Sequence, residues 1–196
     1  MRLLVATTNP GKLVEIREIL AGLPVSLDSL DKYPTVKAAE ENGSTFAENA
    51  RSKACHYSHH TGQLAVAEDS GLEIDALGGA PGVKSARFKG TSYRDKFAAI
   101  NRSLEATGVT TSSARFVCAL AVADDRLVLF EATGVVEGQL VREPKGTGGF
   151  GYDPIFFYPP YGRTLAEVSP TEKAAISHRG RAFRALRKYL ESLLRP

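Results

Sequence analysis

The sequence lacks the features that mark disulfide-stapled, membrane-spanning and secreted proteins. Its 196 residues include only two cysteines, Cys55 and Cys118, and a pair without close spacing is neither a disulfide framework nor a zinc motif. No stretch approaches the roughly 18 apolar residues of a membrane span, and the apolar run after Met1 is too short for a signal peptide. We therefore expect two buried thiols, a cytoplasmic location and no membrane partner.

A large excess of one charge is also missing. The chain has 25 Lys and Arg against 22 Asp and Glu, a net charge of +3, and the two signs are mixed along it. A basic stretch at 181–188 is typical of a solvated helix face, although it leaves open the alternative of a nucleic-acid-binding module. Because the bulk charge is close to neutral, that alternative is the weaker one, and we expect no nucleic-acid partner.

What the chain does contain is an alternation of strand and helix patterns. Capping-box pairs, Thr45 with Glu48 and Ser92 with Asp95, predict the starts of two helices. The full pattern predicts strands at 3–6, 25–27 and 64–67, helices after 12, 45 and 92, a long hairpin around 124–125, a short strand within 154–158 and a C-terminal helix. The apolar hairpin strands suggest burial on both faces. The order predicts an α/β fold, a mixed β-sheet with flanking helices, with two lobes about a cleft.

Two segments near the ends of predicted strands suit phosphate and metal chemistry. Thr7-Thr8-Asn9-Pro10-Gly11-Lys12 lies between a strand and a helix, where free N–H groups and the helix dipole favour an anion. Glu68 and Asp69 follow the strand at 64–67. Their side chains point to opposite faces if the strand continues, and can meet at one Mg²⁺ ion if the chain bends at Ser70-Gly71. An ordinary helix start and an ordinary turn are the alternatives.

Two further segments gain interest only beside these. Glu40 and Glu41 lie in a loop before the helix that carries Lys53, and either feature alone is more typical of a solvated surface. The segment SPTEKAAISHRG at 169–180 contains Lys173, His178 and Arg179, and its glycine at 180 favours an interruption of the helix between 177 and 180.

The run GTGGFGYDP at 146–154 is too rich in aromatics for a flexible linker. We interpret it as a loop in which missing side chains let backbone approach a ligand. Phe150 or Tyr152 would then be available to stack on a base, and Asp153 to accept a hydrogen bond from substrate or hold a neighbour.

Six motifs occur here in one order: T-x-N-x-x-K at 7–12, E-x-G-x-x-F-x-E-N-A at 41–50, E-D-S-G-L at 68–72, G-G-A-P-G at 78–82, G-F-G-Y-D-P at 149–154 and S-H-R at 177–179. Together they resemble the inosine triphosphate pyrophosphatase family, the XTP/dITP diphosphatases. The last two motifs argue against the related Maf-type pyrophosphatases. The resemblance implies hydrolysis of ITP, dITP and XTP to the monophosphate and pyrophosphate, with Mg²⁺ as cofactor. It also implies a homodimer and an elongated two-lobed domain, residues 1–196, with the site in its central cleft.

The resemblance also implies roles for individual residues. Asp69 would be the proton acceptor, and Glu41 and Asp69 would bind the metal, with the spacing to Lys53 favouring Glu41 over Glu40. The implied substrate-binding residues are Thr7, Thr8, Asn9, Pro10, Gly11, Lys12, Lys53, Ser70, Phe150, Gly151, Tyr152, Asp153, Lys173, His178 and Arg179.

Overall fold

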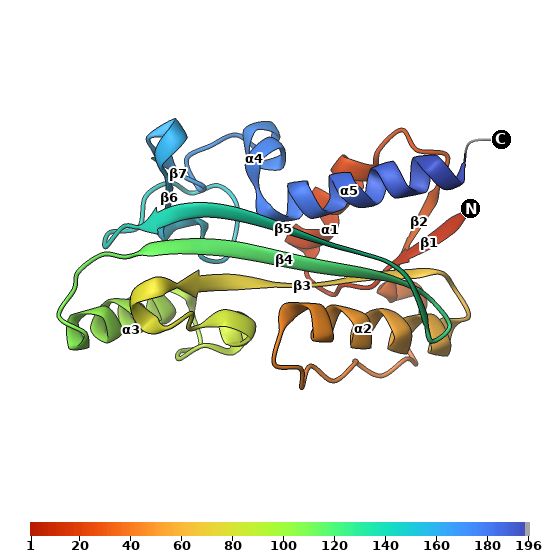
Figure 1. Cartoon of the computed structure of the whole chain (residues 1–196), viewed down its shortest axis with the longest axis horizontal. Coiled ribbons are helices and arrows are strands. Elements are labelled where there is room, and N and C mark those ends of the chain that lie inside the picture. The colour runs from red at the N-terminus through yellow and green to blue at the C-terminus, as the bar shows by residue number, and fades with distance from the viewer. Residues whose placement is uncertain (195–196) are drawn as a thin grey trace. The chain divides into compact units, whose positions relative to one another are not determined.

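A computed structural model of the chain, which describes residues 1–194, contains one mixed seven-stranded sheet with helices packed against it (Figure 1). The strand order is β2-β1-β3-β4-β5-β6-β7. Strand β1 pairs in parallel with β2 and β3, whereas β6 is antiparallel to β5 and β7. The predicted α/β class with a mixed sheet is thus confirmed.

The elements follow the predicted alternation, with different ends. The strands are β1 (Arg2–Val5), β2 (Ser26–Ser29), β3 (Ala65–Ile74), β4 (Ser113–Asp124), β5 (Leu127–Leu140), β6 (Phe156–Tyr158) and β7 (Arg163–Thr164). The α-helices are α1 (Pro10–Leu20), α2 (Phe46–Thr61), α3 (Tyr93–Ala106), α4 (Pro170–Ile176) and α5 (His178–Leu193). Both predicted capping boxes are present, at Thr45 and Ser92. None of the helices within residues 1–194 combines the length and apolar character that crossing a bilayer needs.

The chain divides into two compact units, and each has its own hydrophobic core. Unit 1 comprises residues 1–69, 118–134 and 178–196, and unit 2 comprises 70–117 and 135–177. In unit 1, α1 and α5 contribute Ile16, Leu20, Phe183 and Leu186 to a core with β1, β3 and β4. In unit 2, Phe97 and Ile100 of α3 pack with Leu72 and Phe156. The predicted cleft and the elongated shape stay predictions.

Three expectations about these elements are wrong in part. Strand β3 does not stop before Glu68 but continues to Ile74. Strand β5 alternates exposed and partly buried residues over its first half, so it is not buried on both faces there, whereas β4 is largely buried. Cys118 is buried as expected, but Cys55 is only half-buried.

Candidate active site

The turn that precedes α1 is held by its own side chains. Asn9 is the N-cap residue, and its Oδ1 accepts a hydrogen bond of 3.1 Å from Lys12 N–H. Thr7 Oγ1 in turn accepts one of 3.2 Å from Asn9 N–H. Pro10 occupies the first turn of the helix, where a missing N–H costs nothing. The sequence therefore specifies this turn locally, and the positive end of the α1 dipole lies beside it.

The turn lines a pocket of about 480 Å³ in unit 1. Thr7, Thr8, Asn9 and Pro10 form one wall, and the other lining residues are Leu13, Arg17, Ser29, Leu30 and Asp31. Arg17 Nη2 lies 3.5 Å from Ser29 Oγ, and Ser29 donates a hydrogen bond to Asp31. The sequence did not point to Arg17 or Asp31, because their meeting depends on the pairing of β2 with β1.

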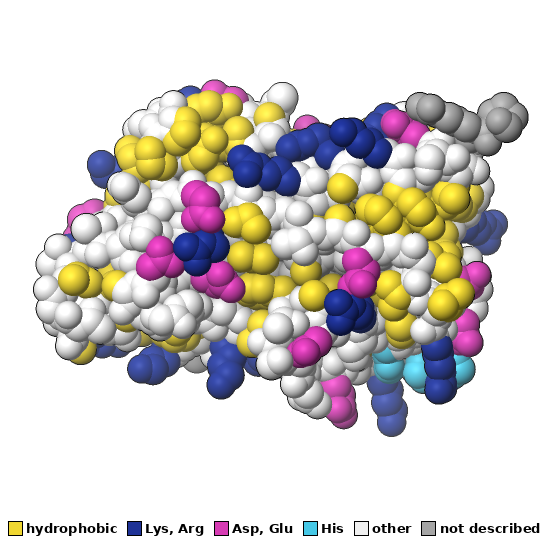
Figure 2. All heavy atoms as spheres, in the orientation of Figure 1, with side chains coloured by type: hydrophobic (Ala, Val, Ile, Leu, Met, Phe, Trp, Pro, Cys, Tyr) yellow, Lys and Arg dark blue, Asp and Glu magenta, His cyan; other side chains and the backbone are white. Residues whose placement is uncertain are grey.

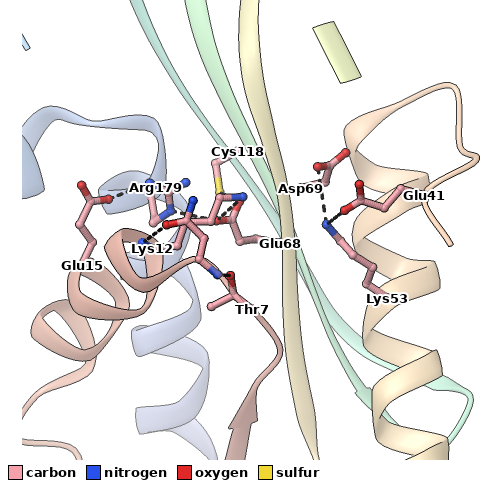
Figure 3. A network of polar contacts seen from close by, with 10 residues as sticks. Thr7, Lys12, Glu15, Glu41, Lys53, Glu68, Asp69, Cys118 and Arg179 are labelled. Atoms are coloured by element: carbon pink, nitrogen blue, oxygen red, sulfur yellow. Dashed lines mark hydrogen bonds and ion pairs between the residues drawn. The ribbon is translucent and has the colours of Figure 1, made fainter. Parts of the chain in front are cut away.

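Glu68 lies at the centre of a buried network of charges (Figure 3). Its Oε1 accepts from Arg179 Nε at 3.0 Å and is 3.1 Å from Lys12 Nζ. Arg179 Nη1 donates to Glu15 Oε2 at 2.7 Å, and Cys118 Sγ lies 3.5 Å from Glu68 Oε2. The network therefore links Lys12 of the turn at 7–12 to Arg179 of the S-H-R motif through Glu68, while Glu15 of α1 binds Arg179 as well.

The network keeps Glu68 ionised. Burial alone would raise the pKa of this carboxyl, but the charges of Arg179 and Lys12 outweigh burial and hold the pKa far below its usual value. The same pairing raises the pKa of Arg179, against the opposing effect of burial. Glu68 is thus ionised at neutral pH and its charge is balanced by protein cations, and this makes it a poor candidate for a metal ligand or a base.

Of the two arrangements that the sequence left open for Glu68 and Asp69, the structure shows the one in which the strand continues. Because β3 runs straight through both residues, their side chains leave the strand on opposite faces. Figure 3 shows Glu68 directed toward α1 and α5, and Asp69 directed toward α2. Ser70 and Gly71 remain in the strand, so the alternative of a bend at these residues is ruled out.

Asp69 belongs to a second cluster on the α2 side of β3. Lys53 Nζ is 2.6 Å from Glu41 Oε1 and 3.6 Å from Asp69 Oδ1. Asn49 Nδ2 donates to Asp69 Oδ2 at 2.8 Å, and Asn49 Oδ1 accepts from Gly43 N–H at 2.8 Å. Asn49 therefore ties the loop that carries Glu41 to the strand that carries Asp69. It appears in the matched motif, yet its role could not be read from the sequence.

The second cluster has the opposite electrostatic balance. Burial raises the pKa of Asp69, and the nearby charge of Glu41 adds to this, against the lowering effects of Lys53 and Asn49. For Lys53, burial lowers the pKa, but Asp69 and Glu41 outweigh burial, so the pKa is raised overall. Two carboxylates with one lysine give this cluster an excess of negative charge. A carboxylate pair is the donor set that Mg²⁺ takes together with water and phosphate. The residues present therefore fit this cation.

The edge of β3 beside both carboxylates is not covered by β1. Strand β1 pairs Val5 with Val66 and then leaves the sheet, so Glu68 and Asp69 lie beyond its end. Brought to this edge, a ligand has Lys12 on one face of β3 and Lys53 on the other.

In unit 2 the structure brings together Phe150, Asp153 and Lys173. Asp153 Oδ2 accepts from Phe150 N–H at 2.8 Å and from Lys173 Nζ at 2.5 Å. Lys173 Nζ also lies 4.6 Å from the centroid of the Phe150 ring, within the range of a cation–π contact. Asp153 is 2 % exposed, so of the two roles expected for it, the structure shows the second, in which it holds neighbours.

The positions of Tyr152 and Gly149 differ from the interpretation of the glycine run as a ligand-binding loop. The Tyr152 ring packs in the core of unit 2 and its hydroxyl donates to Ser85 O at 2.8 Å, so it is not available to stack on a base. Gly149 has φ +66°, and a Cβ there would lie 2.1 Å from Asp153 Oδ2. Its missing side chain makes room for the Asp153 carboxylate, whereas Gly151 faces Tyr93 at ordinary contact distance.

The S-H-R motif starts a new helix, as the expected interruption requires. Helix α4 ends at Ile176, Ser177 is its C-cap, and α5 begins at His178. The break lies at Ser177, and Gly180 continues inside α5, so the glycine does not cause it. A Cβ on Gly134 would lie 2.1 Å from His178 O. Gly134 therefore lets the start of α5 approach β5. No sequence motif pointed to this glycine.

Comparisons with known proteins agree with the geometry. The model of the Ham1 family matches residues 3–189. The chain belongs to the Ham1 family. Family members of known name include a dITP/XTP pyrophosphatase from Desulforamulus reducens, 45% identical over 98% of this chain and 97% of the relative. Another dITP/XTP pyrophosphatase, from Gloeobacter violaceus, is 47% identical over 94% of this chain and 91% of the relative.

Solved structures of the family share the fold. A HAM1 protein from Coxiella burnetii superposes with a TM-score of 0.90 at 41% identity, over 98% of this chain and 99% of the other. A dITP/XTP pyrophosphatase from Mycobacterium abscessus gives a TM-score of 0.74 at 39% identity, over 98% and 100%. The resemblance drawn from the six motifs is thus confirmed at the level of the family and of the fold.

Proposed function

We propose that the chain hydrolyses the non-standard purine nucleoside triphosphates dITP, XTP and ITP to the nucleoside monophosphate and pyrophosphate. Such an enzyme removes deaminated purines from the nucleotide pool. The observation that carries the proposal is the Asp69–Lys53–Glu41 cluster, on the part of β3 beyond the end of β1, in a chain whose family relatives bear the name dITP/XTP pyrophosphatase.

Asp69 is the proposed proton acceptor. It would take the proton from a water molecule that attacks the α-phosphorus, and the raised pKa of this carboxyl makes it a stronger base than an exposed aspartate. Asn49 orients Asp69 through its hydrogen bond of 2.8 Å. Lys53 and Lys12 would stabilise negative charge on the phosphate oxygens. Glu68 would take no part in proton transfer, because its ion pairs keep it ionised and engaged.

Mg²⁺ is the proposed cofactor, and Glu41 and Asp69 are the residues that would hold it. When bound, such an ion neutralises phosphate charge and lowers the pKa of bound water. Glu41 takes this role instead of Glu40 because only Glu41, of the two, pairs with Lys53 among the described residues, while Glu40 accepts from Asn42 on the surface.

We propose that residues of the S-H-R motif and of unit 2 recognise the purine base of the substrate. Hypoxanthine and xanthine carry a 6-oxo acceptor where adenine carries an amino donor, so N–H donors from His178, Arg179 or backbone would favour the former. Polar groups left unpaired by the wrong base can account for discrimination of about 10⁴-fold. Phe150 is the aromatic that remains for stacking, since Tyr152 is in the core. Ser70 and Lys173 are proposed as further substrate contacts.

The decisive experiment measures pyrophosphate release from ITP, dITP, XTP, ATP and GTP, with and without Mg²⁺. We expect release from the first three, much slower release from ATP, and loss of activity when EDTA removes the metal. Equal rates with ATP and ITP would refute the base selection, and no release from any substrate would refute the function. The homodimer and the cytoplasmic location stay predictions, and sedimentation equilibrium tests the first.

A further inference from the structure

Three of the four histidines of the chain, His56, His59 and His60, lie within the last turns of α2. None of them has a role in the proposed reaction. Figure 2 shows imidazole side chains gathered on the surface, in the region that Figure 1 labels as the end of α2. His59 and His60 are exposed and His56 is half-buried, so a small ion from solvent can reach them.

Hydrogen bonds to backbone carbonyls fix the tautomers of two of these rings. His56 Nε2 is 2.8 Å from Lys37 O, and His60 Nδ1 is 2.8 Å from His56 O. A carbonyl oxygen only accepts hydrogen bonds. In the neutral rings, the proton of His56 therefore lies on Nε2 and the proton of His60 lies on Nδ1. This assignment leaves the lone pairs on His56 Nδ1 and His60 Nε2. Carbonyl contacts of this kind orient metal-binding histidines and raise their basicity.

His59 differs because both of its nitrogens already have partners. Its Nδ1 is 2.6 Å from Asp125 Oδ1, and its Nε2 is 3.3 Å from Arg126 Nη2. Since arginine only donates, the lone pair of His59 lies on Nε2 and accepts that hydrogen bond. His59 therefore anchors α2 to the β4–β5 turn and offers no lone pair to an ion.

The remaining two histidines are placed as a chelating pair. His56 and His60 are one helical turn apart, on the same face of α2, and their ring centroids are 4.4 Å apart with the planes tilted by 35°. An ion about 2 Å from one nitrogen of each ring lies roughly 3 Å from each centroid. The observed separation is therefore short enough for both rings to bind one ion after small side-chain rotations.

We propose that His56 and His60 form a binding site for one divalent transition-metal ion of the Zn²⁺, Ni²⁺ or Cu²⁺ class. Imidazole nitrogen suits these ions, whereas Mg²⁺ prefers oxygen ligands. Within residues 1–194, no three or more His, Cys, Asp or Glu side chains converge to hold an ion, so the site has two protein ligands and water completes the coordination. The site is separate from the one proposed at Glu41 and Asp69, and it does not depend on the proposed function.

The test is a Zn²⁺ titration of the purified full chain, without an affinity tag, in competition with a coloured chelator at pH 7.5. We expect one strongly competing Zn²⁺ per chain. His56→Ala and His60→Ala should each weaken binding at least about tenfold, because each removes a ligand. His59→Ala is the matched control and should retain the affinity within about threefold, since its nitrogens bind protein groups.

Two results would overturn the proposal. One is the absence of Zn²⁺ binding by the folded wild-type chain, and the other is unchanged affinity in both His56→Ala and His60→Ala. Asp69→Asn locates the ion further, because the proposal requires that this variant bind Zn²⁺ like the wild type. If Asp69→Asn lost Zn²⁺ binding while His60→Ala bound Zn²⁺ as tightly as the wild type, the ion would be placed at the carboxylates instead.

A second measurement follows the ion through stability. Zn²⁺ that binds only the folded chain raises the midpoint of thermal unfolding. We expect this rise in the wild type and in Asp69→Asn, and its loss in His60→Ala. If the His60→Ala variant folds normally and Zn²⁺ raises its unfolding midpoint as much as that of the wild type, the proposed site is contradicted.

Discussion

Glu68 and Asp69 are neighbours with the same charge and similar burial, yet they occupy opposite electrostatic environments. Glu68 is closed in by Lys12 and Arg179 on one face of β3, and its pKa is held far below the usual value. Asp69 lies on the other face, near Lys53 and Glu41, and its pKa is raised. The alternation of a strand has separated one acidic pair into a carboxylate held in ion pairs and the carboxylate that we propose as the base. Two carboxylates of similar burial therefore have pKa values shifted in opposite directions, because different charges lie beside them.

The largest expected effect breaks the Glu68 side. Glu68→Gln should destabilise the fold by about 3 kcal/mol, because it leaves Arg179 buried with only part of its counter-charge. Urea unfolding at pH 7 measures the change. The matched control is Glu18→Gln on the exposed face of α1, which should change stability by no more than about 0.5 kcal/mol. Equal stability of both variants would show that the buried pair contributes nothing net.

The next effect breaks the Asp69 side. Asp69→Asn should lower kcat for ITP at least about a hundredfold, in the range of general-base catalysis, while the fold survives because Asn preserves shape and hydrogen-bonding capacity. Initial rates and circular dichroism measure the two properties. Near-normal turnover by a folded Asp69→Asn variant would remove Asp69 from the role of base.

A comparison of the two neighbouring glutamates sharpens the assignment of the metal. Glu41→Gln should raise the Mg²⁺ concentration for half-maximal activity about tenfold or more, because it removes one of the two proposed ligands. Glu40→Gln should leave it within about twofold, since that side chain is exposed and bonded to Asn42. Activity titrations with Mg²⁺ distinguish the variants. The reverse ranking would move the ligand to Glu40.

The pH dependence of stability tests the state of Glu68. Its pKa in the folded state lies far below the ordinary 4.5, so the folded chain binds fewer protons than the unfolded chain in the acidic range. The stabilisation is complete above about pH 5 and is lost as the pH falls from there through the folded-state pKa. Urea unfolding at pH 7, 5 and 4 should show a steeper acid loss for the wild type than for Glu68→Gln. Identical slopes would contradict the depressed pKa.

The smallest expected effect concerns the pH dependence of activity. Because the pKa of Asp69 is raised, the acidic limb of kcat/KM should rise with pH through a midpoint above the ordinary aspartate value of 3.8. Asp69→Glu should shift this midpoint, while Glu18→Gln should not. If the acidic limb of the pH profile has the same midpoint in the wild type and both variants, another group controls it.

The sequence by itself determined the local features of this protein. The capping boxes at Thr45 and Ser92 depend on residues within one turn of each other, so they could be predicted. The ordered motifs also identified the family. These signals are strong because each is specified by neighbours along the chain.

Only the tertiary structure decided which of these residues meet. The pairing of Arg179 with Glu15 and Glu68, and of Asn49 with Asp69, joins segments 20 to 164 residues apart. Whether β3 continues past Ala67 is settled by its pairing in the sheet and by packing on both faces, and that decides where Glu68 and Asp69 point. Tyr152 is in the core because its ring packs against Phe97 and other apolar residues of unit 2, which are distant in the sequence. A strand turns each side chain toward whatever the fold has packed on that face, and the sequence of the strand alone does not contain that neighbour.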